Sequence, residues 1–91
     1  MGHPDFRVGG KVFATLGPDE VWGMVKLTPE QQAASLSMEP KTYQPFNGAW
    51  GKRGYTKVIL AAAKTTSVGP ALIAAWRNVA PRRLIKRFDE E

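Results

Sequence analysis

The residues with the most evident binding chemistry lie between positions 47 and 58, in the segment NGAWGKRGYTKV. Its glycines permit a tight backbone reversal, because glycine adopts positive φ without a steric penalty. Trp50 and Tyr55 flank the cations Lys52 and Arg53, which predicts a β-hairpin with a basic tip and aromatic sides. Such a tip suits a phosphate backbone beside a groove or a base face. An ordinary surface hairpin with common turn residues explains the same pattern, so both interpretations stay open.

Positive charge is concentrated in the second half of the chain. The net charge is +5, and residues 1–40 hold three basic and five acidic residues, whereas residues 41–91 hold ten basic and three acidic ones. Such asymmetry is expected of a surface that meets a polyanion, and it also serves solubility. Cations near a helix C-terminus would in addition complement the helix dipole. The densest basic cluster consists of Arg82, Arg83, Lys86 and Arg87.

Catalytic chemistry is poorly represented. His3 is the only histidine and there is no cysteine, so Cys–His nucleophilic catalysis is excluded and a Ser–His–acid site would need this terminal residue. Asp19-Glu20 in a predicted turn and the acidic tail at 89–91 are better explained as solvated charge than as metal ligands. The glycines do not form the G-x-x-x-x-G-K-[ST] pattern of a phosphate-binding loop. We therefore expect a protein without enzymatic activity, metal or cofactor.

Length and composition predict a single domain over residues 1–91. Hydrophobic residues make up 43 % of the chain, which is enough for a packed core. The longest apolar run, at 58–63, is far shorter than the ~20 residues that a membrane span requires. The N-terminus has no signal-peptide pattern, and the absence of cysteine fits a reducing compartment. A cytoplasmic location is therefore expected.

A glycine pair predicts a first β-hairpin near the N-terminus. Two alternating runs meet at Gly9-Gly10, and a type I′ turn requires positive φ at both central positions. A two-residue loop would place Val8 opposite Lys11 and Phe6 opposite Phe13. The buried face predicted for this hairpin consists of Phe6, Val8 and Phe13.

The remaining segments alternate between strands and helices. Thr28 and Gln31 match a capping box at the start of a helix, Ser67 is expected to cap a second helix, and Pro40 and Pro81 limit the two helices. The predicted strands cover 5–8, 11–16, 21–27, 43–50 and 55–61, the predicted helices cover 28–39 and 67–80, and a basic amphipathic segment covers 82–88. The order β-β-β-α-β-β-α predicts an α+β fold, in which one antiparallel sheet of about five strands carries two helices on one face.

The three tryptophans have different expected roles. Trp76 lies on the apolar stripe of the second helix and is expected in the core. Trp22 alternates with small and apolar neighbours and is expected to be half-buried on the second face of the sheet. Trp50 lies beside the basic tip, where binding competes with packing as its role.

Several blocks of this sequence together resemble the MmcQ/YjbR family. They are His3–Ala14, Val25–Leu27 with the Pro-Glu-Gln helix start after it, Asn47–Gly51, Gly54–Thr56, Ala74–Arg77 and Ala80-Pro81. The resemblance covers nearly the whole chain and implies a fold like that of bacterial frataxin, the CyaY-like fold. It also implies the role usually proposed for the family, which is DNA binding through two β-hairpin wings. The positions of the wing tips match Gly9-Gly10 and Lys52-Arg53-Gly54.

The chain departs from the family pattern in two ways. Members usually begin with a helix before the His-Pro-Asp-Phe block, whereas here only Met1-Gly2 precede it. A sheet without that helix should expose apolar surface, so we expect a homodimer that covers it. The iron binding of frataxins involves an acidic ridge on the first helix, and with a basic second half it is not carried over to this chain.

These observations combine into one leading hypothesis. We expect a small binding module that contacts DNA mainly through phosphates, with little sequence preference. The alternative is a protein-interaction or small-ligand module that uses the uncovered apolar surface, and an enzyme comes last. The residues expected to bind nucleic acid are Arg7, Lys11, Trp50, Lys52, Arg53, Tyr55, Arg82, Arg83, Lys86 and Arg87.

Overall fold

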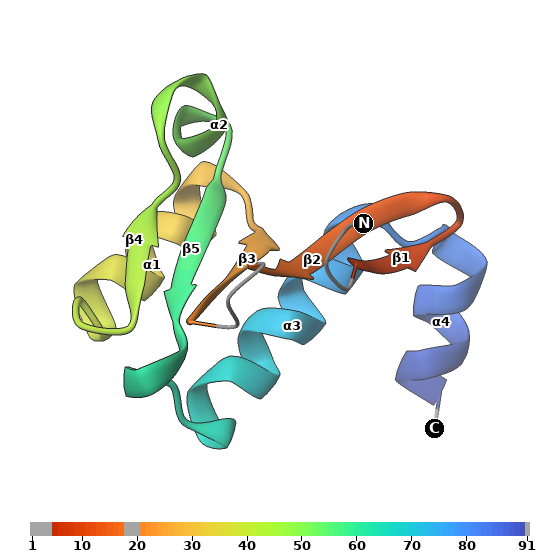
Figure 1. Cartoon of the computed structure of the whole chain (residues 1–91). Helices are drawn as coiled ribbons and strands as arrows, with labels where there is room; N and C mark the ends of the chain where they lie inside the picture. The colour runs from red at the N-terminus through yellow and green to blue at the C-terminus, as the bar shows by residue number, and fades with distance from the viewer. Residues whose placement is uncertain (1–4, 18–20, 91) are drawn as a thin grey trace.

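A single antiparallel sheet organises the protein. The computed structural model describes residues 5–17 and 21–90, and its strands occur in the order β1-β2-β3-β5-β4 across the sheet. The strands are β1 (Asp5–Val8), β2 (Lys11–Leu16), β3 (Trp22–Lys26), β4 (Tyr43–Pro45) and β5 (Tyr55–Ile59), as Figure 1 shows. His3 and the Asp19-Glu20 pair lie outside the described residues.

Within the described residues, four α-helices and a short 3-10 turn connect and follow the strands. They are α1 (Pro29–Met38), α2 (Gly48–Lys52), η1 (Leu60–Ala62), α3 (Thr65–Val79) and α4 (Arg82–Glu90). The predicted α+β class with a five-stranded antiparallel sheet is confirmed. The α1 and α3 helices correspond to the two expected ones, whereas α2 replaces the outer part of a predicted strand and α4 is a separate helix.

The first hairpin has the predicted turn and a register that the sequence did not predict. Gly9 and Gly10 have φ values of 58° and 79°, as a type I′ turn demands, and Val8 pairs with Lys11. A β-bulge then shifts the register so that Phe6 pairs with Ala14 and not with Phe13. The expected Phe6–Phe13 pair is therefore wrong. Phe6 lies on the edge strand of the sheet and is 45 % exposed.

The α1 helix begins at the predicted capping box. The backbone N–H of Gln31 donates to the Thr28 hydroxyl over 3.2 Å, and the Thr28 N–H donates to the Gln31 side chain over 2.9 Å. These reciprocal bonds satisfy two backbone donors that a helix start otherwise leaves free. The helix ends with Glu39 as its C-cap, because Pro40 disfavours the helical conformation of the residue before it.

The predicted strand over 43–50 is wrong in its second half. The β4 strand stops at Pro45, and the chain enters α2 at Gly48, whose φ is 65°. Proline has no N–H to continue a ladder, and the positive φ of Gly48 turns the backbone away from the extended conformation. The basic tip expected in a hairpin turn is therefore the end of a five-residue helix.

The α3 helix starts earlier than predicted. Its N-cap is Lys64, so the helix begins before Ser67 rather than being capped by it. Its C-cap is Ala80, and Pro81 separates it from α4, as expected from the effect of proline on the preceding residue. Its innermost residue is Ala75, with no exposed surface, whereas Trp76 is only half-buried and not part of the buried core.

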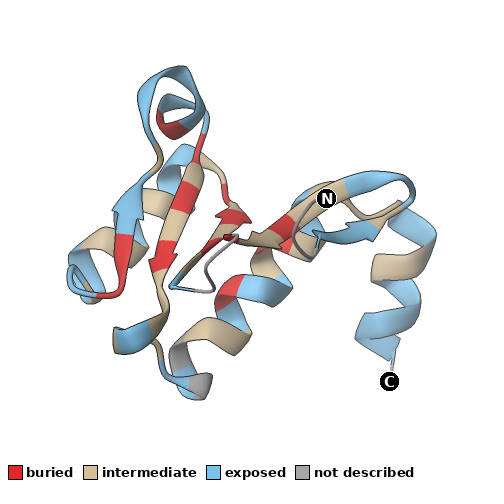
Figure 2. Ribbon diagram, in the orientation of Figure 1, coloured by how far each residue is buried: buried red, intermediate tan, exposed pale blue. Residues whose placement is uncertain are grey.

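The core lies between one face of the sheet and the helices α1 and α3. Residues that pair across strands share a face, and Ala14, Val25 and Thr56 form one such row. Figure 2 shows buried residues running along β3 and β5. Leu36 of α1 and Val68 of α3 pack against this same cluster, so both helices cover one face. The buried cluster consists of Ala14, Val25, Leu27, Tyr43, Val58, Ala71 and Ala75.

The opposite face of the sheet carries a different set of side chains. Strand alternation turns these residues away from α1 and α3, and their strand pairings place Met24 opposite Lys57 and Lys26 opposite Tyr55. We call this surface the open sheet face. It consists of Trp22, Met24, Lys26, Gln44, Tyr55 and Lys57.

Candidate nucleic-acid interface

The second wing is formed by β4, α2 and β5, and it joins two aromatic rings to a guanidinium group. The rings of Trp50 and Tyr55 meet edge to face, with centroids 4.8 Å apart and an interplanar angle of 84°. The Arg53 guanidinium carbon lies 5.9 Å from the centre of the Trp50 ring, a cation–π distance. Trp50 is 53 % exposed, and Lys52 beside it is exposed too. The ring–cation grouping predicted from the sequence is therefore present on this wing.

Glycine allows the base of the second wing to pack closely. Gly54 has a φ of 105°, and the Leu27 N–H donates to its carbonyl over 3.2 Å. A Cβ atom added to Gly54 would lie 2.0 Å from the Leu27 carbonyl oxygen, which no side chain tolerates. The buried Thr56 hydroxyl also donates to the Gly54 carbonyl, over 2.8 Å. This glycine therefore joins the wing to the end of β3.

A side chain from α1 holds the second wing from the other side. The Gln32 amide nitrogen donates to the Gly51 carbonyl over 3.1 Å and to the Tyr55 carbonyl over 3.0 Å. These two acceptors lie on either side of the tip, so one amide group connects both of its ends to α1. The wing is thereby fixed against the body of the protein.

The open sheet face continues the pattern of rings and cations from the wing. The Lys57 ammonium lies 5.5 Å from the centre of the Trp22 ring, and the Lys26 ammonium lies 5.6 Å from that of Tyr55. Trp22 also contacts Phe46, with ring centroids 5.6 Å apart. Each of these cations lies within the range of a cation–π interaction.

This surface also contains three residues that were not expected to bind nucleic acid, namely Lys26, Lys57 and Phe46. The available signal was the period of two along strands, which already placed Trp22 and Lys26 on one side. What the sequence did not provide was the pairing of β3 with β5, which are separated in the chain by α1, β4 and α2. That non-local pairing brings Lys26 beside Tyr55.

The first wing, formed by β1 and β2, lies next to the basic end of the chain. A Cβ on Gly9 would be 3.5 Å from Pro81, so the tip of this wing touches the turn between α3 and α4. Lys11 at the tip is exposed. Arg7 is exposed as well and lies 3.4 Å from the Asp5 carboxylate, a surface pair that contributes little to stability.

The α4 helix carries the predicted basic end on its surface. It is joined to α3 by a bidentate ion pair between Arg77 and Asp89 and by ring contact between Trp76 and Phe88, whose centroids are 5.4 Å apart. Arg82 and Arg83 lie in the first turn of α4, whereas the sequence suggested a position near a helix C-terminus. The favourable dipole interaction expected for them is therefore absent. The exposed cations of α4 are Arg82, Arg83, Lys86 and Arg87.

The two wings occupy opposite edges of the sheet, and the strand pairing directs their tips toward the same end. The first wing ends at Val8 and Lys11, and the second leaves the sheet at Pro45 and Tyr55. Both points lie toward the end of β3 that carries Lys26. Figure 1 shows the two wings separated, with α2 on one and α4 beside the other. The structure thus forms two basic groups, and Trp50, Arg53 and Tyr55 belong to only one.

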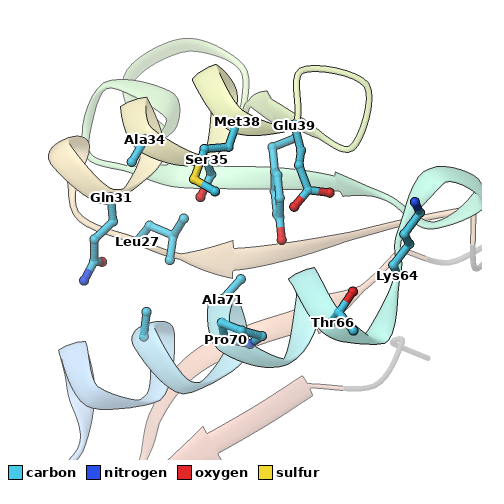
Figure 3. A pocket seen from close by; sticks show the side chains of 12 residues that line it. Leu27, Gln31, Ala34, Ser35, Met38, Glu39, Lys64, Thr66, Pro70 and Ala71 are labelled. Carbon is cyan, nitrogen blue, oxygen red and sulfur yellow. The ribbon is translucent and has the colours of Figure 1, made fainter.

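A groove separates α1 from α3 on the covered face of the sheet. It has a volume of about 640 Å³, within the range of small-molecule sites. Figure 3 shows Ala34 and Ser35 of α1 on one side, Pro70 and Ala71 of α3 on the other, and Leu27 between them. The lining is mostly apolar.

In the ranges 5–17 and 21–90, no group of three His, Cys, Asp or Glu side chains has the geometry to hold a metal ion. None of the helices described there is both long and apolar enough to cross a membrane.

Comparison with known proteins places the chain in a family. A family model described as YjbR matches residues 1–78, a range that holds both wings, the open sheet face and most of α3. No curated protein and no solved structure matches the chain significantly. The matched range includes the blocks around Gly9-Gly10 and 47–56 that carry the resemblance in the sequence. The chain therefore belongs to the YjbR family.

Proposed function

We propose that this protein is a non-enzymatic, cytoplasmic module that binds DNA through its phosphates with little sequence specificity. The observation that carries the proposal is the second wing, where the Arg53 guanidinium lies 5.9 Å from the ring of an exposed tryptophan, Trp50. Rings beside cations are typical of surfaces that meet a nucleic-acid backbone together with its bases or sugars.

The distribution of exposed cations supports the same proposal. Both wing tips lie toward one end of the sheet, and α4 adds a third basic element beside the first wing. Phosphates are spaced regularly along a strand, so separate basic elements facing one polyanion add their contacts. The cations available for such contacts are Arg7, Lys11, Lys52, Arg53, Arg82, Arg83, Lys86 and Arg87.

The salt dependence of DNA affinity tests this proposal. The logarithm of the binding constant falls with the logarithm of salt concentration by about 0.9 per phosphate contact. If half of the available cations make contacts, a slope of about −3 to −4 is expected for a duplex of mixed sequence. Fluorescence anisotropy of a labelled duplex over a series of salt concentrations measures it. A slope near zero, or no binding at low salt, contradicts the proposal.

We also propose that a second copy of the chain covers an apolar surface on α3 and its neighbours. Leu72, Ile73 and Phe88 are 37 %, 43 % and 47 % exposed, and they line a hollow of about 260 Å³ together with Phe13 and Trp76. Contiguous exposed apolar surface of this kind usually marks an interface, and a self-complementary contact in a two-fold dimer is the simplest way to cover it.

Sedimentation over micromolar to millimolar concentrations is expected to show a dimer that the substitution Ile73→Lys converts to a monomer. Lysine at this position would place a charge inside the contact. The matched control is Met38→Lys, because Met38 is 78 % exposed on α1 and outside this surface. A wild-type monomer at every concentration overturns the dimer.

The groove between α1 and α3 favours a second candidate function, the binding of a small apolar ligand. Its volume and mostly apolar lining fit such a ligand. Titration of nucleic acid against an apolar dye bound to the protein distinguishes the two functions. A dye in the groove leaves both wings free, so nucleic acid should not displace it.

A further inference from the structure

We infer that the open sheet face is a stacking platform for the bases of single-stranded nucleic acid, so that the protein binds single strands in preference to duplexes. This inference rests on the proposed function and names the class of nucleic acid. The platform combines two parts of the molecule. The second wing contributes Trp50 and Arg53, and the open sheet face contributes Trp22 and Tyr55 with the cations Lys57 and Lys26.

Each ring of this platform is paired with one cation. Lys57 lies over Trp22 at 5.5 Å, Lys26 over Tyr55 at 5.6 Å and Arg53 over Trp50 at 5.9 Å. A base stacked on such a ring keeps its own phosphate within reach of the adjacent cation. Stacking and charge neutralisation are the two contributions that single-strand binders combine.

The three rings follow one direction, from the wing tip along the sheet. Trp50 meets Tyr55 edge to face at 4.8 Å, Lys26 pairs with Tyr55 across β3 and β5, and Trp22 lies on the same face at the far end of β3. Trp22 and Lys26 are four residues apart, about 13 Å along a strand. The path therefore runs from the wing tip along the sheet, as an extended strand of nucleotides would.

The three rings of this platform lie outside the buried cluster that forms the core. The buried cluster lies on the other face with α1 and α3, whereas Trp22 and Tyr55 stay half-buried and Trp50 is more than half exposed. Rings that remain accessible on one sheet face are available to bases, and a sheet of four or five strands can stack two or three bases in this way.

A duplex cannot use this surface in the same manner. The faces of its bases are stacked on each other, and only their edges are accessible in the grooves. The undistorted major groove admits an α-helix or a two-stranded ribbon rather than a five-stranded sheet, so an undeformed duplex would contact mainly the wing tips. Single strands with unpaired bases would engage both the cations and the rings.

Competition between oligothymidylate and a duplex of equal nucleotide length tests the inference. We expect the wild-type protein to bind the single strand at least tenfold more tightly. The substitution Trp50→Ala is expected to weaken single-strand binding about 5- to 100-fold, the range that stacking of one base supplies, and to weaken it at least fivefold more than duplex binding. The matched control is Met38→Ala, because Met38 is a large apolar side chain, 78 % exposed on α1, which covers the other face of the sheet.

A second pair of variants addresses the sheet itself. Trp22→Leu removes the far ring, and Met24→Glu places a negative charge at the centre of the face opposite Lys57 without removing a ring. Both are expected to weaken single-strand binding at least fivefold more than duplex binding. Met24→Glu keeps the test valid if Trp22→Leu fails to fold.

The outcomes separate the inference from the proposed function. Equal or stronger duplex binding, with no effect of Trp50→Ala or Met24→Glu, overturns the single-strand inference and leaves phosphate binding by the wings intact. Equal losses for Met38→Ala and Trp50→Ala also overturn it. No binding of either nucleic acid overturns both.

Discussion

Replacing Gly54 with alanine is expected to destabilise the protein by at least about 3 kcal/mol. The new Cβ would lie 2.0 Å from the Leu27 carbonyl oxygen, at a backbone φ of 105° that L side chains rarely adopt. Relief of that contact requires β3 and the second wing to separate, which breaks the bond from the Leu27 N–H to the Gly54 carbonyl. In a domain of this size the melting temperature should fall by roughly 12–24 °C, measured by circular dichroism.

Gly48→Ala is the matched control for this prediction. Gly48 also has positive φ, at 65°, but nothing lies within 4 Å of its added Cβ. Only the conformational penalty applies there, about 1–2 kcal/mol. If the two variants have the same melting temperature, the close approach of Gly54 to Leu27 does not contribute to stability.

The double substitution Lys52→Ala/Arg53→Ala is expected to weaken duplex binding roughly 100-fold at about 50 mM salt. Each cation removed eliminates up to one phosphate contact, so the salt slope should become less negative by up to about 1.8. Both residues are exposed at the end of α2, and the fold should be unaffected. Binding at several salt concentrations measures affinity and slope together.

Lys41→Ala/Lys64→Ala removes the same charge at another place. Both lysines are exposed and line a hollow beside α1 and the start of α3, away from both wing tips. This control should lower affinity only through the change in net charge, with the slope preserved. If both double variants lose affinity and slope equally, the second wing is not a specific contact.

Local signals in the sequence predicted the parts of the fold that depend on a few adjacent residues. The type I′ turn at Gly9-Gly10 follows from the positive φ that glycine accepts. The capping box of Thr28 and Gln31 follows from side chains three residues apart. The end of α3 before Pro81 has the same local character.

Features that depend on distant residues were not predicted. The bulge that pairs Phe6 with Ala14 depends on the fit of the first hairpin to the rest of the sheet. Strand propensity favoured an extended conformation to Trp50, but the carbonyl of Phe46 lies so close to Gly51 that only glycine fits there, and the chain forms α2.

The candidate site shows the same division between local features, which were predicted, and features that depend on distant residues, which were not. The ring–cation group on the second wing lies within six residues of sequence, between Trp50 and Tyr55, and its pattern was visible. Lys26 and Lys57 join that group only because β3 pairs with β5. The basic end forms a helix of its own beside the first wing because Pro81 breaks the chain there.

The two hydrogen bonds from the Gln32 amide to the carbonyls of Gly51 and Tyr55 have a consequence for the entropy of binding. A loop that must be ordered by its ligand loses conformational freedom at that moment, and the loss subtracts from affinity. The backbone of the second wing is already ordered in the folded protein, because Gln32 of α1 is hydrogen-bonded to both ends of the tip. The first wing rests instead on the turn at Pro81. A ligand that binds the second wing therefore meets a tip whose backbone is already ordered, so its contacts contribute to affinity without a backbone ordering penalty.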